Sequence, residues 1–205
     1  MPISDTLLQQ YRDLAAATVY EGAGKSGDMS PEIRPVTEQC RIVARAYTVR
    51  CWPGDGSAMM RSVDEAAPGD VLVIDAGAPR ACGWGGGASV AAKFRGLAGT
   101  ITNGTVRDVA QIRSLGYPTF AGGICVRGAM RNQRGWTNIP VTVGEAIVHP
   151  GDLVIADIDG VVVVPAVRAE EVLEAALKRR AHEEEADRRL SAGTPYSDWT
   201  GTRQR

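Results

Sequence analysis

Residues 83–108, GWGGGASVAAKFRGLAGTITNGTVRD, combine a glycine run, a helix, a strand and an Arg-Asp pair in one short unit. Gly85, Gly86 and Gly87 precede small and helix-forming residues, so the sequence predicts a helix that starts at the glycines. The first turn of a helix leaves backbone N–H groups unpaired, and the helix dipole adds a partial positive charge there. The amides from Gly85 to Ala88 are therefore candidates for binding an anion.

The predicted strand at residues 98–103 places Arg107 and Asp108 on the turn that follows it. A guanidinium group binds a carboxylate through two parallel hydrogen bonds, and an aspartate can hold a metal ion or move a proton. Each part also has a plain alternative, because three glycines can form a flexible loop and an Arg-Asp pair can be two solvated charges. Together, bare amides and an arginine suit one carboxylate ligand.

The composition is that of one soluble globular domain. The chain has 205 residues, of which 44% are hydrophobic and 23% are charged. Its net charge of −1 gives no electrostatic argument for binding nucleic acid or an anionic membrane. No stretch approaches the roughly 18 apolar residues of a membrane span, and the N-terminus has no signal-peptide pattern, so we expect a cytoplasmic location.

Scarce residue types narrow the possible chemistry. Cysteines without a CxxC motif predict reduced thiols and neither a zinc knuckle nor a disulfide framework. Few histidines make a histidine-rich zinc site or a Ser-His-Asp triad hard to assemble, so any metal would be held mainly by oxygen. Few lysines leave little choice for a Schiff-base nucleophile. The residues are Cys40, Cys51, Cys82, Cys125, His149, His182, Lys25, Lys93 and Lys178.

Helical and strand patterns interleave along the chain, but without the strict βαβ alternation of a Rossmann sheet. No GxGxxG follows a first strand, and residues 83–87 lack the Lys-Ser/Thr of a P-loop, which disfavours nucleotide binding. We predict an α/β fold, a compact sandwich with mixed strands. Helices are predicted at residues 4–17, with Ser4 as N-cap, and at 58–66, 109–115 and 166–190. Strands are predicted at 40–52, 71–75, 118–125 and 139–148, and a hairpin at 153–164. A basic loop contains Arg127, Arg131 and Arg134.

The order of several sequence segments resembles that of the RraA-like family over residues 15–165, and the C-terminal helix continues the match. In chain order the segments are PGDVLVIDA, a WGG turn, a helix, GLAGTITNGTVRD, GYPTFAGG and NIPVTVGEAIVHPGDLVIADIDGVVVVP. That family contains 4-hydroxy-4-methyl-2-oxoglutarate/4-carboxy-4-hydroxy-2-oxoadipate aldolases, oxaloacetate decarboxylases and a ribonuclease-binding regulator. The resemblance implies a single-domain layered sandwich over residues 1–190 with a mixed sheet and a long C-terminal helix, and we expect an irregular tail at 191–205. It also implies a homotrimer or homohexamer with the active site between subunits.

The resemblance implies a divalent-metal-dependent carbon–carbon lyase. Such an enzyme performs retro-aldol cleavage or decarboxylation of a 2-oxo acid through a metal-stabilised pyruvate enolate. Arg107 would bind the substrate carboxylate, Asp108 would hold Mg²⁺ or Mn²⁺ directly or through waters, and the amides from Gly86 to Ala88 would bind the same substrate group. These roles agree with the residue chemistry, because Mg²⁺ keeps several waters and needs only one or two carboxylates.

One position departs from the aldolase pattern. The aldolases place an acid that helps to hold the catalytic water 21 positions before the arginine, and this chain has Gly86 there. Asp75, at the end of the preceding predicted strand, could substitute for that acid or could be a structural cap. Arg80 is a candidate for binding a second substrate carboxylate.

Two further functions stay open. The chain could be a divergent lyase or hydratase acting on another carboxylate substrate, or a non-catalytic regulator that binds a ribonuclease and needs no metal. Regulators of the family tend to lose the aspartate after the arginine, and this chain keeps Asp108. That retention favours an enzyme whose partner is a small 2-oxo acid, with no nucleic acid and no membrane.

Overall fold

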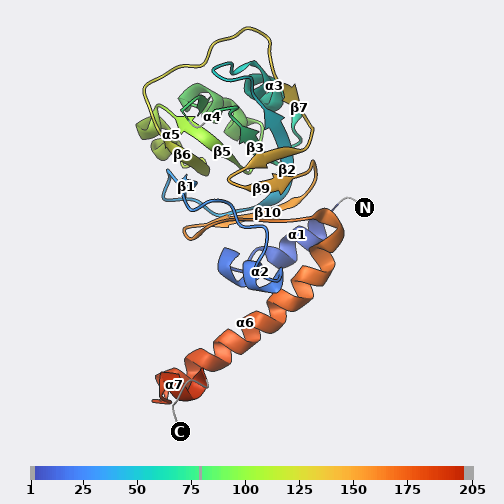
Figure 1. The fold of residues 1–205 in the computed structure, drawn as a ribbon, viewed down its shortest axis with the longest axis vertical. Coiled ribbons are helices and arrows are strands. Elements are labelled where there is room, and N and C mark those ends of the chain that lie inside the picture. Colours follow the sequence, from blue (N-terminus) through green and yellow to red (C-terminus); the bar gives the residue numbers. More distant parts are fainter. Residues whose placement is uncertain (1–2, 79, 201–205) are drawn as a thin grey trace.

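A mixed β-sheet forms the centre of the molecule. The computed structural model describes residues 3–78 and 80–200 (Figure 1). Its main sheet has nine strands in the order β1-β6-β5-β3-β2-β10-β11, with β4 paired to β5 and β7 paired to β2. The sheet is mixed, as expected, because β10 pairs with β2 and β11 in antiparallel fashion. Its parallel part contains β2 (Ile42–Arg50), β3 (Val71–Asp75), β5 (Gly99–Val106) and β6 (Thr119–Ile124), and the short β4 also pairs with β5 in parallel.

The parallel strands are joined by helices that lie together on one side of the sheet (Figure 1). These helices are α3 (Ser57–Glu65), α4 (Gly86–Phe94) and α5 (Val109–Leu115). Residues 42–124 alternate strand and helix with one interruption, so the strict βαβ alternation of a Rossmann sheet is not kept even in this part of the chain. The interruption is the short strand β4 (Cys82–Trp84), which is inserted between β3 and α4.

Side chains on β3 alternate between two hydrophobic cores, as the period of a strand requires. Leu72 and Ile74 pack with the side chains of α3, α4 and α5. Val71 and Val73 pack on the opposite face with a separate hairpin, β8 (Val141–Val143) and β9 (Ala146–Val148). The continuous apolar run predicted at residues 71–75 is thus a strand that is covered on both faces.

A third core lies beneath the antiparallel end of the sheet. There α1 (Asp5–Tyr11), α2 (Ala16–Gly22) and α6 (Ala169–Ser191) pack on the hairpin of β10 (Leu153–Asp157) and β11 (Gly160–Val164). The long C-terminal helix is confirmed, and it extends away from the body toward α7 (Tyr196–Trp199) (Figure 1). The short helix α7 lies in the tail expected to be irregular. No helix in residues 3–78 and 80–200 is both long and apolar enough to cross a membrane.

Some elements differ from the sequence prediction. The helix expected over residues 4–17 is divided into α1 and α2, although Ser4 is the N-cap as predicted and its Oγ accepts the Leu7 N–H at 3.1 Å. The strand expected at 139–148 is the hairpin β8-β9, which turns at Gly144 and Glu145 with positive φ at both residues. The remaining strands, β1 (Arg34–Pro35) and β7 (Trp136–Thr137), were not predicted.

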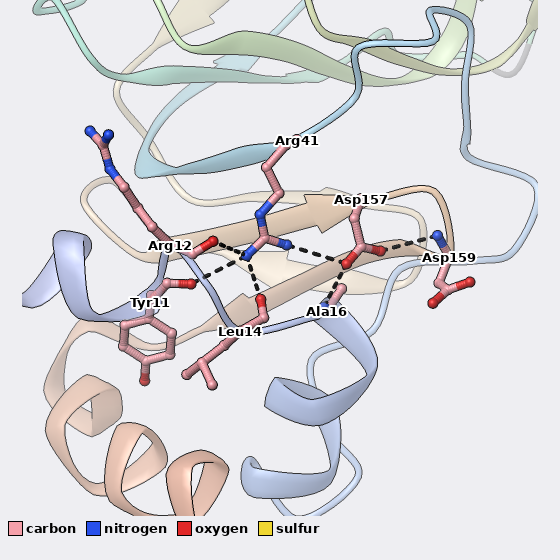
Figure 2. A network of polar contacts seen from close by, with 7 residues as sticks. All are labelled: Tyr11, Arg12, Leu14, Ala16, Arg41, Asp157 and Asp159. Atoms are coloured by element: carbon pink, nitrogen blue, oxygen red, sulfur yellow. Dashed lines mark hydrogen bonds and ion pairs between the residues drawn. The ribbon is translucent and has the colours of Figure 1, made fainter. Parts of the chain in front are cut away.

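A partly exposed ion pair lies at the point where the N-terminal helix is divided (Figure 2). Arg41 lies 3.2 Å from the Asp157 carboxylate and donates to backbone carbonyls at the end of α1 and in the link that follows. Asp157 also accepts the N–H of Ala16, the first residue of α2, at 2.7 Å. One pair thus stabilises the end of one helix and the start of the next. The carbonyl acceptors are those of Tyr11, Arg12 and Leu14.

Candidate active site

The candidate site is a cavity of about 340 Å³ at the carboxyl end of β5. In α/β sheets with parallel strands, ligands bind at this end of the strands. The walls come from α3, from the first turns of α4 and from the loop that follows β6. The charged lining residues include Asp64, Arg107, Asp108 and Arg131, and the apolar ones include Met59, Val63 and Ala91.

Asp108 links the starts of two helices. It is the N-cap of α5 and has a left-handed backbone with φ of 58°. Its side chain does not cap α5, and its Oδ2 instead accepts the N–H of Gly86 at the start of α4, at 3.2 Å. Aspartate tolerates this backbone region better than most residues do. The carboxylate is therefore held at the cavity wall by the neighbouring helix.

Arg107 remains available to a ligand. Its Nε lies 3.5 Å from Asp108 Oδ2, and both side chains are 46% exposed. An ion pair this exposed contributes little to stability, so a ligand carboxylate can compete for the guanidinium. A Cβ at Gly128 would lie 2.7 Å from Arg107 Nη1, so the glycine leaves space for the guanidinium.

The start of α4 offers fewer free amides than expected. Gly86 is buried and its N–H is already bonded to Asp108. Gly85, Gly87 and Ala88 line the cavity, and within the described chain no group accepts the N–H of Gly87 or Ala88. An incoming anion would therefore meet these last two amides first.

Two sequence candidates lie outside the cavity. Arg80 is exposed on the turn between β3 and β4, and the structure does not bring it to the cavity wall. Asp75 Oδ1 accepts the Gly77 N–H at 3.0 Å and the Asn103 amide at 3.2 Å, while its Oδ2 lies 3.3 Å from Arg50 Nε. These contacts make Asp75 a structural residue at the end of its strand, and it lines a different cavity.

Sequence reasoning missed two residues that shape the site. Arg131 belongs to the basic loop, which the sequence singled out only as a loop, and it lines the cavity together with Arg107. Gln111 fills the space beside Gly86, where an added Cβ would lie 2.0 Å from its Oε1. A cluster of arginines without neighbouring acids was the available signal for Arg131. No signal marked Gln111.

The donor groups fit a metal ion that keeps most of its water ligands. Among the residues that the structure describes, no three His, Cys, Asp or Glu side chains are grouped to hold a metal. Asp108 and Asp64 are carboxylates on the cavity wall, and Asp64 lies 3.6 Å from Arg95 Nη1. One carboxylate with waters is enough for Mg²⁺, whereas a structural zinc site needs a closed set of ligands. Asp108 is the residue that would hold the cation.

Comparison with known proteins decides the family. A family model described as RraA-like, Aldolase/RraA, matches residues 4–163. The chain belongs to the RraA-like family. An RraA-like relative from Halalkalibacterium halodurans, named "Putative 4-hydroxy-4-methyl-2-oxoglutarate aldolase", is 31% identical over 185 residues, which are 90% of this chain and 88% of that protein.

Solved structures confirm the RraA-like fold. A protein of Pseudomonas syringae pv. tomato superposes with a TM-score of 0.86 at 25% identity, over 98% of this chain and 99% of the other. Streptomyces coelicolor RraAS2, described as an unusual member of the RNase ES inhibitor RraA protein family, superposes with a TM-score of 0.83 at 28% identity. That match covers 92% of this chain and 100% of RraAS2. RraA-like relatives thus include one named as an aldolase and one assigned to an inhibitor family.

Proposed function

We propose that the chain is a divalent-metal-dependent carbon–carbon lyase that cleaves or decarboxylates a 2-oxo acid. One observation supports this proposal: one cavity is lined by Arg107, Asp108 and the free backbone amides of Gly87 and Ala88. Relatives named as aldolases agree with it. A small carboxylate is the ligand that these groups suit.

Arginine and backbone N–H groups bind the 2-oxo acid part of the substrate, which keeps the electron pair when the carbon–carbon bond breaks. The Arg107 guanidinium binds the carboxylate of the 2-oxo acid, and the N–H groups of Gly87 and Ala88 donate to the same end. When the carbon–carbon bond breaks, its electron pair stays on the 2-oxo fragment as an enolate. Donors that hold the carboxylate in a fixed position keep the breaking bond and the keto oxygen in the orientation that the reaction needs, which lowers the barrier.

The cation and the proton have separate sources. Asp108 would hold Mg²⁺ or Mn²⁺, and the bound cation would supply Lewis-acid chemistry for the negative charge that develops on the substrate. The Gly86 N–H fixes the orientation of Asp108. Gln111, beside Gly86, can hydrogen-bond a water but cannot exchange a proton at neutral pH as an acid would. Protonation of the enolate therefore falls to water from the open cavity.

Pyruvate release tests the lyase proposal. We expect the purified protein, with Mg²⁺ or Mn²⁺, to release pyruvate from a 4-hydroxy-2-oxo acid or from oxaloacetate, measured with a coupled lactate dehydrogenase assay. Arg107→Gln should lower kcat/KM by about 100-fold or more, since it removes the group that binds the substrate carboxylate and orients the substrate for the reaction. Asp108→Asn should abolish the dependence on metal while it keeps the backbone. Arg80→Gln is the matched control, and a full 2-oxo acid panel without metal-dependent turnover would exclude the proposal.

A second candidate is a non-catalytic regulator that binds a ribonuclease. The likeness to RraAS2 and the missing acid at Gly86 favour it. This candidate predicts binding to a large ribonuclease scaffold that EDTA does not change, together with no turnover. A pull-down with and without EDTA separates it from the lyase. A divergent lyase or hydratase would instead act on other carboxylates in the same panel.

We also propose that the chain forms a homotrimer or homohexamer, as the family resemblance implies. Large side chains remain exposed near the cavity, among them Ile124 at 60%, Val126 at 95% and Met130 at 59%. Such a group of apolar side chains is compatible with a subunit interface. Light scattering measures the state directly, and a monomer would contradict the proposal.

A further inference from the structure

We propose that Trp84 and Ser89 are positioning residues, which hold the Asp108 carboxylate in place at the cavity through a chain of hydrogen bonds. The inference rests on the proposed function, in which Asp108 would hold the cation. The chain runs from the Trp84 indole to the Ser89 hydroxyl, then through the peptide group between Gly85 and Gly86, and ends at the carboxylate. Two residues outside the Arg-Asp pair thus determine how that pair presents its acid.

The donors in this chain all point the same way. An indole N–H can only donate, so Ser89 Oγ is the acceptor of the Trp84 Nε1 hydrogen, at 2.6 Å. The single hydroxyl hydrogen of Ser89 is then free to donate to the Gly85 carbonyl oxygen, 3.1 Å away. Hydrogen bonds joined head to tail in this way polarise and strengthen one another. The polarity of the whole chain is therefore fixed by the indole at its start.

One peptide group carries the chain from Ser89 to Asp108. The Gly85 carbonyl and the Gly86 N–H belong to the same planar unit, so fixing one of them fixes the other. The carbonyl accepts both the hydroxyl and the backbone N–H of Ser89, each at 3.1 Å. The N–H at the opposite end donates to Asp108 Oδ2 at 3.2 Å. Rotation of this peptide group would break hydrogen bonds at both of its ends.

The glycines on both sides of this peptide group allow the carboxylate to approach the backbone closely. A Cβ at Gly85 would lie 3.3 Å from Asp108 Oδ2, and a Cβ at Gly86 would lie 3.0 Å from Asp108 Cβ. Both distances are shorter than ordinary van der Waals contact between such atoms. Because Asp108 packs directly on the backbone, a small shift of this peptide group would move the carboxylate.

The start of the chain is anchored in the core. Trp84 and Ser89 are both 0% exposed, and the Trp84 ring is stacked on the Tyr117 ring with centroids 6.2 Å apart. The backbone carbonyl of Trp84 also accepts the N–H of Arg107 at 3.2 Å. Trp84 is thus linked to Arg107 through its backbone and to Asp108 through its indole. A buried, well-packed residue of this kind can set the geometry of both charged groups.

Mn²⁺ affinity tests the positioning role. We expect Ser89→Ala to weaken Mn²⁺ binding about tenfold, measured by electron paramagnetic resonance, as is usual when a group that orients a metal ligand is removed. Ser62→Ala is the matched control. Ser62 is also 0% exposed and lies in α3, where its hydroxyl donates to the Met59 carbonyl at 2.7 Å. This control loses the same kind of bond and should keep the Mn²⁺ affinity of the wild-type protein.

Nuclear magnetic resonance tests the chain in the metal-free protein. The indole N–H of Trp84, identified by its loss in Trp84→Phe, reports on one end of the chain, and Asp108→Asn removes the charge at the other end. We expect Asp108→Asn to move the indole proton upfield, because a weaker final acceptor weakens the bonds before it. The response should vanish when Ser89→Ala is also present. Asp64→Asn removes another carboxylate from the same cavity wall and should leave the indole proton in place.

Three results would overturn the inference. The first is Mn²⁺ binding by Ser89→Ala that is as tight as that of the wild-type protein, and the second is an equal loss of affinity in Ser62→Ala. The third is an indole proton that does not respond to Asp108→Asn, or responds equally without the Ser89 hydroxyl. Failure of the proposed function alone has a different signature. The wild-type protein then shows no Mn²⁺ binding or no turnover of any acid in the panel, while the indole proton still responds to Asp108→Asn through Ser89.

Discussion

At the scale of single residues, the missing side chain at Gly86 and the position of Gln111 depend on each other. A Cβ at Gly86 would lie 2.0 Å from Gln111 Oε1 and 3.0 Å from Asp108 Cβ. An acid cannot be restored at this position unless Gln111 moves. The space beside Gly86, where the resemblance to the aldolases leads us to expect an acid, therefore holds the Gln111 amide.

Restoring the acid requires Gln111 to rotate away. Its amide is the far end of an exposed side chain, so the rotation costs little. We predict that Gly86→Asp lowers the free energy of unfolding by less than about 1 kcal/mol, and that Gly86→Asp combined with Gln111→Ala stays within about 0.5 kcal/mol of Gln111→Ala alone. Urea denaturation measures both variants. A loss of several kcal/mol in the single variant would contradict the prediction.

The same pair of variants reports on chemistry. If this chain is a weakened aldolase, the double variant releases pyruvate faster than Gln111→Ala does, since an acid near the cavity can assist proton transfer. A slower rate would indicate that the site without the acid accommodates a different substrate. The coupled assay for pyruvate decides between these outcomes.

Buried Cys51 makes stability depend on alkaline pH. Burial raises the pKa of its thiol to about 12. In the unfolded chain a thiol titrates near ~8.5, so above that pH the unfolded state loses a proton that the folded state keeps. We predict that the free energy of unfolding falls as pH rises above about 8.5, by at most ~1.4 kcal/mol per pH unit from this group. Urea melts at several pH values should show a shallower fall for Cys51→Ala.

The residues of the site were only partly predictable from sequence. Arg107 and Asp108 were found because they are adjacent and follow a strand, so one local pattern contains both. Arg131 was not found, because the bond from Asn132 to Asp55 that fixes its loop joins residues 77 positions apart. A pattern read along the chain carries no information about such a contact.

At the scale of elements, Asp157 is the anchor of α2. Its carboxylate accepts the Ala16 N–H at 2.7 Å and pairs with Arg41, whose guanidinium also donates to carbonyls at the end of α1 and in the link that follows (Figure 2). We predict that Asp157→Ala lowers the free energy of unfolding by about 2 kcal/mol, since it leaves a partly buried cation without its anion. Hydrogen exchange should show the loss of protection mainly in α1 and α2.

Asp159 provides the control for this experiment. It contributes only its backbone N–H to Asp157 Oδ1, at 3.1 Å, and Asp159→Ala keeps that bond. This variant should stay within about 0.5 kcal/mol of the wild-type protein, as for most surface substitutions. Equal losses in Asp157→Ala and Asp159→Ala would show that the network does not stabilise the helices.

Regular elements were the most predictable part of the fold. The limits of β3 and α5 agree with the sequence pattern because each is bounded by local turn residues, such as Gly69 before β3 and Gly116 after α5. The break between α1 and α2 was not predictable, since it depends on a distant arginine. A two-residue strand such as β1 is defined only by its pairing with β6, and it is too short to show an alternating pattern in the sequence.

At the scale of the whole molecule, β10 couples two of the three cores. Val154 and Ala156 face the core under the β8-β9 hairpin, whereas Leu153 and Ile155 face the core of α1, α2 and α6. The core of α3, α4 and α5 shares β3 with the core under the β8-β9 hairpin. Unfolding of any one core would therefore expose one face of a strand that also packs in another core.

Shared strands predict cooperative unfolding. Ile155→Ala should lower the free energy of unfolding by about 2–5 kcal/mol, the usual cost of a large-to-small change in a core. Tryptophan fluorescence, to which buried Trp84 in the α3-α4-α5 core contributes, should change at the same denaturant concentration as far-UV circular dichroism in both proteins. An early separate loss of helical signal would show that α1, α2 and α6 unfold as an independent unit.

The left-handed backbone at Asp108 limits how this position can change in evolution. Most side chains are strained there, whereas asparagine and glycine are tolerated, and each is a single-nucleotide change from an aspartate codon. Either change removes the charge that would hold a cation and leaves the turn into α5 intact. If Asp108 holds a cation as proposed, one mutational step would therefore remove the cation ligand without disturbing the fold. Loss of the proposed activity and retention of a binding surface would then require no change in the scaffold.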